Sequence, residues 1–275
     1  MSPTPPPTQL PLPRAPSAPP GRVPPGAFGH NRGVVERNYA FIPPEGVLKS
    51  RLPAYAETVV RFLAAPSLGA QFAQFVLEIA PGGGTPQPVA ADVQHFFYVL
   101  SGTATLAIDG RPAVALPQDG YAYLPPDTPF TLRNHGSDET RVLTVKKRWE
   151  PAPGLTPPDP FTGQRDDAQQ TNHTGLEGRG FLHLTGYGDL RHDFEMNLMY
   201  FAPGTSFPAI ETHIMEHGLY MLEGQGLYLL GRDWHEIWAH DFIWMGSFCP
   251  QQFYPTGQGR AVYLLYKNVN RDVAL

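Results

Sequence analysis

The chain has 275 residues, 41% of them apolar, which is enough to bury one large core or two of ordinary size. Its 20 basic and 25 acidic residues give a formal charge of -5 without a basic stripe, which argues against a nucleic-acid partner. No stretch approaches ~20 consecutive apolar residues and no secretory signal is evident, so we expect no membrane span. Cys249 is the single cysteine, and together these features lead us to expect a cytoplasmic protein.

The first part of the chain divides into a tail and a strand-rich domain. Residues 1–27 hold eleven prolines and no periodic apolar pattern, so we expect a disordered proline-rich tail. Residues 28–149 contain short runs of Val, Phe, Tyr and Leu, separated by glycine and proline turns such as Asp109-Gly110. That pattern is typical of antiparallel strands and predicts an N-terminal β-barrel or sandwich.

A second strand-rich domain is predicted at residues 171–275, after a polar and proline-rich linker at residues 150–170. Helical periodicity is scarce. Residues 57–64 could form a turn or two of helix, although the β-branched pair Val59-Val60 disfavours it. We therefore expect an all-β protein of two tandem antiparallel barrels of the jelly-roll type, with few short helices.

The second domain carries four residues at metal-ligand spacing. The sequence ETHIMEHGLYMLEG, followed by FIWMGSFCPQ, contains Glu211, His213, His217 and Gln251. Because side chains alternate along a strand, Glu211 and His213 are expected to share a face. Two imidazoles, a carboxylate and an amide carbonyl form a mixed nitrogen and oxygen donor set that suits a six-coordinate divalent ion.

The same local pattern occurs earlier in the chain. The run HFFYVLSGTATLAIDG, which begins at His95, aligns with HGLYMLEGQGLYLLGR, which begins at His217. In this alignment Val89 takes the place of Glu211, Ala91 that of His213 and Phe130 that of Gln251. A single imidazole holds a divalent ion weakly, so we expect the first domain to be structural and the second to carry the chemistry.

Two small β-barrels in tandem, each with a His-bearing strand followed by a glycine turn, resemble the bicupins of the cupin superfamily. The usual cupin order is His-x-His, then Glu, then a distant His. This chain instead has Glu-x-His-x-x-x-His and a distant Gln, together with the terminal run YLLYKNVNRD. In these features it resembles the (S)-ureidoglycine aminohydrolase family, from about residue 30 to 272.

This resemblance implies a Mn²⁺-dependent enzyme of purine catabolism that converts (S)-ureidoglycine and water into (S)-ureidoglycolate and ammonia. It implies that Glu211, His213, His217 and Gln251 bind one ion in the C-terminal cupin, while the N-terminal cupin is degenerate. The substrate contacts that it implies are Tyr228, Tyr263 and Lys267. It also implies that the protein binds a small-molecule substrate and forms a homo-oligomer. For proton transfer, Glu211 and Lys267 are the candidate catalytic groups.

Several alternatives stay open at this stage. A shift of one residue would turn Gln252 rather than Gln251 inward. Tyr228 and Tyr263 could be barrel aromatics, and Lys267 could be solvated, although alternation from Tyr263 favours an inward position. Two His and one carboxylate also occur in non-haem iron dioxygenases, and a non-catalytic sensor or scaffold would leave the four ligands vestigial.

Overall fold

The computed structural model describes residues 32–89, 92–172, 175 and 177–268. The predicted tail, residues 1–27, lies outside these ranges. The described part of the chain is built from strands and three 3-10 helices, η2 (Pro44–Gly46), η3 (Pro66–Leu68) and η4 (Arg165–Asp167). The all-β prediction is therefore confirmed, and the helical candidate at residues 57–64 is wrong because it lies in a strand. In the described ranges we find no helix with the length and apolar character needed to span a membrane.

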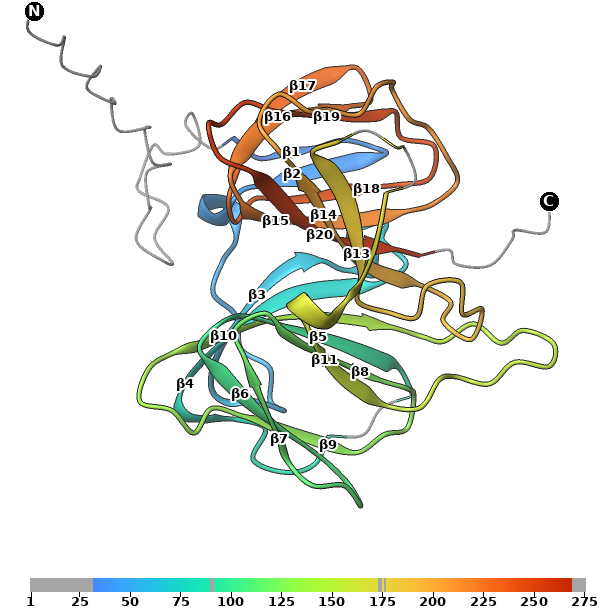
Figure 1. Ribbon diagram of the computed structural model, residues 1–275. Helices are drawn as coiled ribbons and strands as arrows, with labels where there is room; N and C mark the ends of the chain where they lie inside the picture. The colour runs from blue at the N-terminus through green and yellow to red at the C-terminus, as the bar shows by residue number, and fades with distance from the viewer. Residues whose placement is uncertain (1–31, 90–91, 173–174, 176, 269–275) are drawn as a thin grey trace, which may run out of the picture.

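The N-terminal half is a nine-stranded antiparallel sheet that curls on itself (Figure 1). Its strand order is β11-β8-β5-β10-β4-β9-β6-β7, and the remaining strand, β3, also pairs with β4. The bounds are β3 (Ala56–Ala64), β4 (Ala73–Gly84), β5 (Gln94–Ser101), β6 (Thr103–Ile108), β7 (Val114–Pro117), β8 (Gly120–Leu124), β9 (Phe130–Arg133), β10 (Thr140–Lys147) and β11 (Phe161–Gln164).

The C-terminal half places an eight-stranded sheet against a three-stranded one. The larger sheet has the order β1-β2-β18-β15-β20-β14-β13-β12, and the smaller one the order β17-β16-β19. The bounds are β1 (Val34–Val35), β2 (Tyr39–Ile42), β12 (Gln169–Thr171), β13 (Arg179–His183), β14 (Glu195–Phe201), β15 (His217–Glu223), β16 (Gln225–Leu230), β17 (Asp233–Trp238), β18 (Phe242–Met245), β19 (Gln251–Pro255) and β20 (Ala261–Lys267). An apolar core fills the space between the two sheets.

The sheets do not divide at the predicted domain boundaries. Strands β1 and β2 were predicted for the first domain, but β2 pairs with β18 and β1 pairs with β2, so both lie among the C-terminal strands (Figure 1). The guanidinium of Arg32 anchors this segment through two hydrogen bonds of 2.8 and 2.9 Å to the carboxylate of Asp241. Conversely, β11 from the predicted linker pairs with β8 of the N-terminal sheet. Strand exchange depends on pairing between segments distant in sequence, which local composition does not report.

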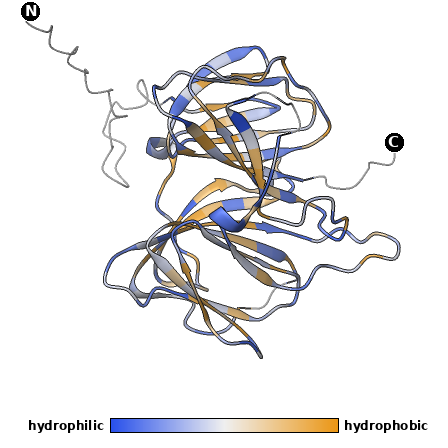
Figure 2. Ribbon diagram, in the orientation of Figure 1, coloured by the Kyte–Doolittle hydropathy of each residue, from blue (hydrophilic) through white to orange (hydrophobic). Residues whose placement is uncertain are grey.

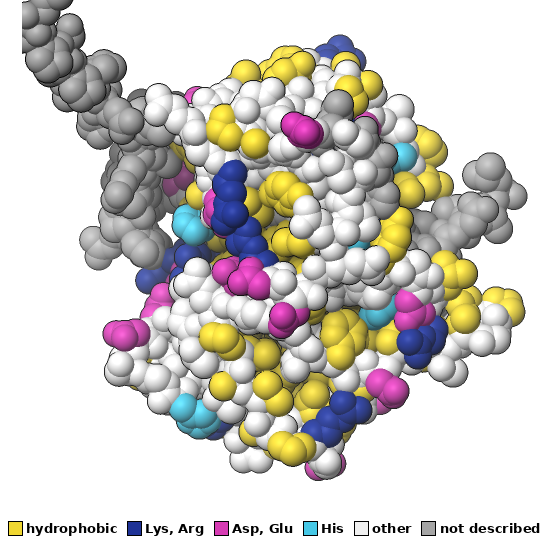
Figure 3. All heavy atoms as spheres, viewed as in Figure 1, with side chains coloured by type: hydrophobic (Ala, Val, Ile, Leu, Met, Phe, Trp, Pro, Cys, Tyr) yellow, Lys and Arg dark blue, Asp and Glu magenta, His cyan; other side chains and the backbone are white. Residues whose placement is uncertain are grey.

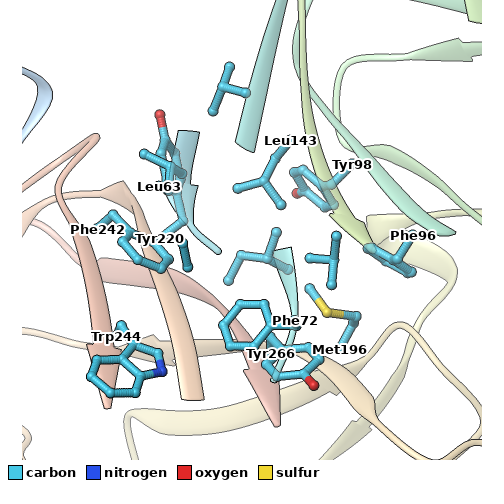
Figure 4. Packing of buried hydrophobic residues seen from close by; sticks show 14 of the residues in the cluster. Leu63, Phe72, Phe96, Tyr98, Leu143, Met196, Tyr220, Phe242, Trp244 and Tyr266 are labelled. Atoms are coloured by element: carbon cyan, nitrogen blue, oxygen red, sulfur yellow. The ribbon is translucent and has the colours of Figure 1, made fainter. Parts of the chain in front are cut away.

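The two halves share a hydrophobic core where their sheets meet. Buried side chains from both halves pack together there, including Phe72 and Leu143 from the first and Tyr220, Trp244 and Tyr266 from the second (Figure 4). The ribbon is correspondingly hydrophobic at this contact (Figure 2). Strand β20 is buried on both faces for this reason, because alternate residues face the interdomain core and the C-terminal barrel. The face of the C-terminal sheet that points away from its own barrel thus packs against the N-terminal half.

Candidate metal and substrate site

A cavity of about 390 Å³ lies within the C-terminal barrel. It is lined by Phe181, His183, Tyr187, Glu195, Asn197, Met199, Phe207, Glu211, His213, Met215, His217, Tyr228, Gln251, Tyr263, Leu265 and Lys267. One wall is the inner face of β13, β14, β20 and β15, where cross-strand pairing arranges residues in rows. One row runs from Glu195 through Lys267 to His217. All of the predicted site residues border this one cavity.

The segment between Glu211 and Glu216 is held in place at both ends. Glu211 pairs with Gln251 in an isolated antiparallel bridge, with both N–H groups donating to the partner's carbonyl at 2.9 Å. At the other end, the buried carboxylate of Glu216 accepts hydrogen bonds from Trp244 Nε1 and from the backbone N–H of Gln71 in the N-terminal half. Glu216 therefore points away from the cavity and fixes the start of the His217 strand.

The chain around His213 is not the continuous strand that we predicted. Only Glu211 forms a bridge, and the residues from 212 to 216 are irregular. The reason lies in the facing segment, where Phe248 has a φ of 60° and donates its N–H to the carbonyl of His213 at 2.7 Å. The left-handed residue turns the facing backbone, so the ladder ends while Glu211 and His213 still face one cavity.

Three polar side chains converge in the cavity. His213 Nε2 lies 3.3 Å from His217 Nε2 and 3.0 Å from Gln251 Nε2. His217 Nδ1 donates to the Tyr266 carbonyl at 3.1 Å, which leaves the lone pair of Nε2 directed at His213. A backbone partner on the far ring nitrogen is the usual means of orienting a metal-binding imidazole.

The spacing of these atoms fits neighbouring ligands of one ion. With bonds of about 2.1 Å, adjacent ligands of an octahedral ion lie about 3.0 Å apart. Gln251 would bind through Oε1, which now accepts from the Tyr228 hydroxyl at 3.1 Å. A turn of the amide exchanges its oxygen and nitrogen, and the hydroxyl can then accept instead of donate.

Glu211 borders the same cavity and its backbone pairs with that of Gln251, but its carboxylate does not form a metal-binding group with His213 and His217. Across the described ranges, no three His, Cys, Asp or Glu side chains lie close enough together to hold a metal ion. The observed convergence is thus of two imidazoles and one amide. The residue types fit a divalent ion, and the carboxylate is the fourth donor that the cavity offers.

Burial shifts the charge states of these groups. Burial, the neighbouring His213 and the charge of Lys267 lower the pKa of His217 to about 3. Burial also lowers the pKa of His213 and raises that of Glu211, which Arg179 partly offsets. Both imidazoles are therefore neutral near pH 7 and present lone pairs, as metal binding requires.

The other predicted residues also face the cavity. Tyr228 and Tyr263 are almost fully buried, and burial raises the pKa of both hydroxyls. Lys267 lines the cavity at the end of β20, as alternation from Tyr263 predicts. Gln251 faces the cavity, whereas Gln252 points away and donates to the Phe207 carbonyl at 2.8 Å.

Three polar residues on this wall are absent from the sequence-based site. Glu195, Asn197 and His183 line the cavity on β14 and β13. The signal for two of them was present in the run EMNLMYF, where alternation places Glu195 and Asn197 on one face with Met199. Polar residues on the inward face of an otherwise apolar strand mark a functional wall.

Three of the four equivalent positions in the N-terminal half carry apolar residues, and one of these, Ala91, lies outside the described residues. Val89 and Phe130 form an isolated antiparallel bridge like that of Glu211 and Gln251, as the internal repeat predicts. His95 is buried, and its ring lies 5.0 Å from Phe130 and 5.8 Å from Phe97. These apolar neighbours support a structural role for His95.

The first comparison with known proteins identifies the class of fold. The cupin domain model matches residues 75–146, which covers most of the N-terminal barrel. The C-terminal barrel repeats the same strand and bridge arrangement. The chain is therefore a bicupin.

Comparison over the whole chain narrows the class to one family. The (S)-ureidoglycine aminohydrolase of Escherichia coli (strain K12) is 32% identical over 248 residues, which cover 89% of this chain and 94% of that one. The (S)-ureidoglycine aminohydrolase of Arabidopsis thaliana is 34% identical, over 89% of this chain and 80% of the relative. The solved structure of protein Ylba from E. coli superimposes with a TM-score of 0.79 at 31% identity, covering 89% of this chain and 97% of that one. The chain belongs to the (S)-ureidoglycine aminohydrolase family, and the resemblance seen in its sequence is confirmed.

Proposed function

We propose that this bicupin catalyses the hydrolytic deamination of (S)-ureidoglycine to (S)-ureidoglycolate and ammonia in purine catabolism. The observation that carries this proposal is the convergence of His213, His217 and Gln251 in a cavity that also presents Lys267. The cavity, at about 390 Å³, suits a small polar molecule. The names of the relatives supply the reaction.

The proposal includes one divalent ion, Mn²⁺, held by His213, His217, Gln251 and Glu211. When bound, such an ion supplies positive charge and a template for the oxygen and nitrogen groups of the substrate. The two neutral imidazoles, the amide and a single carboxylate form a donor set without thiolates, which suits Mn²⁺. The tautomer of His217, fixed by the Tyr266 carbonyl, keeps its donor atom directed into the cavity.

The residues of the chain handle protons and orientation. In the proposed reaction, the ureido nitrogen forms a double bond to the central carbon as the carbon–nitrogen bond to the amine breaks. Water then adds to that carbon to give the hydroxyl group, and the proton that it releases returns to the group that protonated the amine. Lys267 or Glu211 protonates the amine, which leaves as ammonia, and burial raises the pKa of Glu211 above its ordinary value. Tyr228 and Tyr263, whose rings lie 6.4 Å apart, present hydroxyls to the substrate.

The decisive experiment measures ammonia released from freshly prepared (S)-ureidoglycine by metal-loaded protein, with and without oxygen, against an enzyme-free control. We expect release above the control that does not depend on oxygen. Oxygen dependence would indicate a dioxygenase instead. Stoichiometric metal without turnover would indicate a sensor, and the absence of bound metal after supplementation would indicate a scaffold.

The internal repeat provides a matched pair of variants. His217→Gln should lose bound metal and activity together, whereas His95→Gln, at the equivalent position of the first barrel, should retain both. Glu211→Gln and Lys267→Met, measured beside metal content, then test the two proposed proton donors. Unchanged turnover in both would remove them from the mechanism.

We further propose that the protein is a cytoplasmic homo-oligomer without nucleic-acid or membrane partners. The buried thiol of Cys249 fits a reducing compartment. Acidic and basic side chains are interspersed on the face shown in Figure 3. Leu227, Trp234 and Tyr254 are exposed together on the three-stranded sheet, a feature that supports subunit contact. Light scattering coupled to size-exclusion chromatography tests the assembly.

A further inference from the structure

A hydrogen-bonded chain of side chains crosses the cavity wall beside the proposed ligands. The Lys267 ammonium lies 2.8 Å from Glu195 Oε2, and Asn197 Nδ2 donates to the same oxygen at 3.2 Å. Asn197 Oδ1 lies 3.0 Å from His183 Nδ1, and His183 Nε2 lies 2.8 Å from the Thr171 hydroxyl. The chain thus links four neighbouring strands, from β12 to β20.

The strand register explains why these side chains meet. Glu195 is directly opposite Lys267, and Lys267 is directly opposite His217 on the next strand. His183 is opposite Asn197 in the adjacent row. Each side chain therefore occupies a position fixed by backbone pairing, and the ammonium stands between a carboxylate and the proposed ligand row.

Glu195 and Lys267 are more buried than the members of an ordinary surface ion pair. The Glu195 side chain is 8% exposed and that of Lys267 is 25% exposed. Withdrawing a carboxylate from water is expensive unless other partners compensate, and here Asn197 does so. A free lysine side chain would also lose rotamer freedom on being held in one position. The hydrogen bonds to Glu195 hold the Lys267 side chain in place before a ligand binds.

We propose that Glu195, itself oriented by Asn197 and His183, is a positioning residue that holds the Lys267 ammonium ready to bind the carboxylate of the substrate. This inference rests on the proposed function. An ammonium has three N–H donors, and Glu195 occupies one, so the others can address an anionic group in the cavity.

A double-mutant cycle tests the proposal. Glu195→Gln should raise the KM for (S)-ureidoglycine about 10-fold or more, while kcat falls less and metal content stays unchanged. In the Lys267→Met background the same substitution should add no further loss, because Glu195 acts through Lys267. Glu223→Gln, which breaks an ion pair with Arg165 and Arg260 outside the cavity, is the matched control and should leave KM unchanged.

A second measurement does not depend on turnover. Labelling of Lys267 by an amine-reactive reagent, quantified by peptide mass spectrometry against Lys49, should become several-fold faster in Glu195→Gln and remain unchanged in Glu223→Gln. An unaltered KM and labelling rate in Glu195→Gln, or an equal loss with and without Lys267, would overturn the proposal. Failure of the wild-type protein to release ammonia would instead refute the proposed function, while the labelling result would still test the positioning of Lys267.

Discussion

Lys147 offers a direct comparison of a buried and an exposed ion pair on the same side chain. Its ammonium lies 2.7 Å from Asp193 Oδ2, and both side chains are only 2% exposed. It also lies 2.6 Å from Glu150, whose side chain is 64% exposed. Asp193 connects the two halves, because it also accepts from Gln94 Nε2 at 2.6 Å and from the backbone N–H of Glu150 at 2.8 Å.

We predict that Asp193→Asn destabilises the protein far more than Glu150→Gln. At 2.7 Å, an effective dielectric of about 20 gives an attraction of roughly 6 kcal/mol, much of which desolvation offsets. Breaking a buried pair from one side typically costs about 3–5 kcal/mol, and we expect the lower end because Lys147 keeps Glu150. For a chain of this size, about 3 kcal/mol corresponds to a fall in Tm of roughly 6–12 °C. The exposed pair should contribute less than about 1 kcal/mol.

Urea and thermal unfolding of the two variants, followed by far-UV circular dichroism, measure the difference. The paired apolar replacement Lys147→Met with Asp193→Leu should recover most of the stability, since no uncompensated charge remains. Equal midpoints for Asp193→Asn and Glu150→Gln would show that the buried charge is not the source of stability. A double replacement as unstable as Asp193→Asn would lead to the same conclusion.

Three further predictions concern individual residues. Burial and the charge of Lys146 lower the pKa of His95 to about 3, so its neutral form stabilises the fold above pH 6.5 and this contribution is lost as pH falls toward 3. The substitution His95→Phe should therefore reduce the pH dependence of the unfolding free energy by up to about 1.4 kcal/mol per pH unit. An unchanged slope would contradict this prediction. Tyr228→Phe removes the hydroxyl that contacts Gln251 and should weaken Mn²⁺ binding about 10- to 100-fold by calorimetry, with little loss of stability; equal affinity would argue against this supporting role. Gln251→Leu should lower bound metal, whereas Gln252→Leu should lower stability by about 1–3 kcal/mol and leave metal content intact, so the reverse pattern would reassign the ligand.

The features that local periodicity encodes were predictable from the sequence. Alternation along YLLYK places Lys267 in the cavity, and alignment of the two halves predicts the equivalent bridges of Val89 with Phe130 and Glu211 with Gln251. Both inferences use only spacing along the chain and the two-residue period of a strand.

The features that depend on long-range pairing were not predictable. Glu195 becomes part of the site only when β14 pairs with β20 and brings it opposite Lys267. The exchange of β1 and β2 likewise depends on β18, about 200 residues later in the sequence. A continuous strand was expected through His213, and the left-handed backbone at Phe248 ends the ladder instead. Such register and turn details follow from tertiary structure, which sequence periodicity does not contain.

The membership of β1 and β2 in the C-terminal sheet has a consequence for how the protein is made. These strands leave the ribosome about 200 residues before β18, the strand with which β2 pairs. This edge of the C-terminal barrel therefore stays unpaired until β18 has been synthesised. Such non-local closure slows folding and favours help from chaperones during synthesis. It also means that cutting the gene between the barrels would separate each fragment from a strand that it needs.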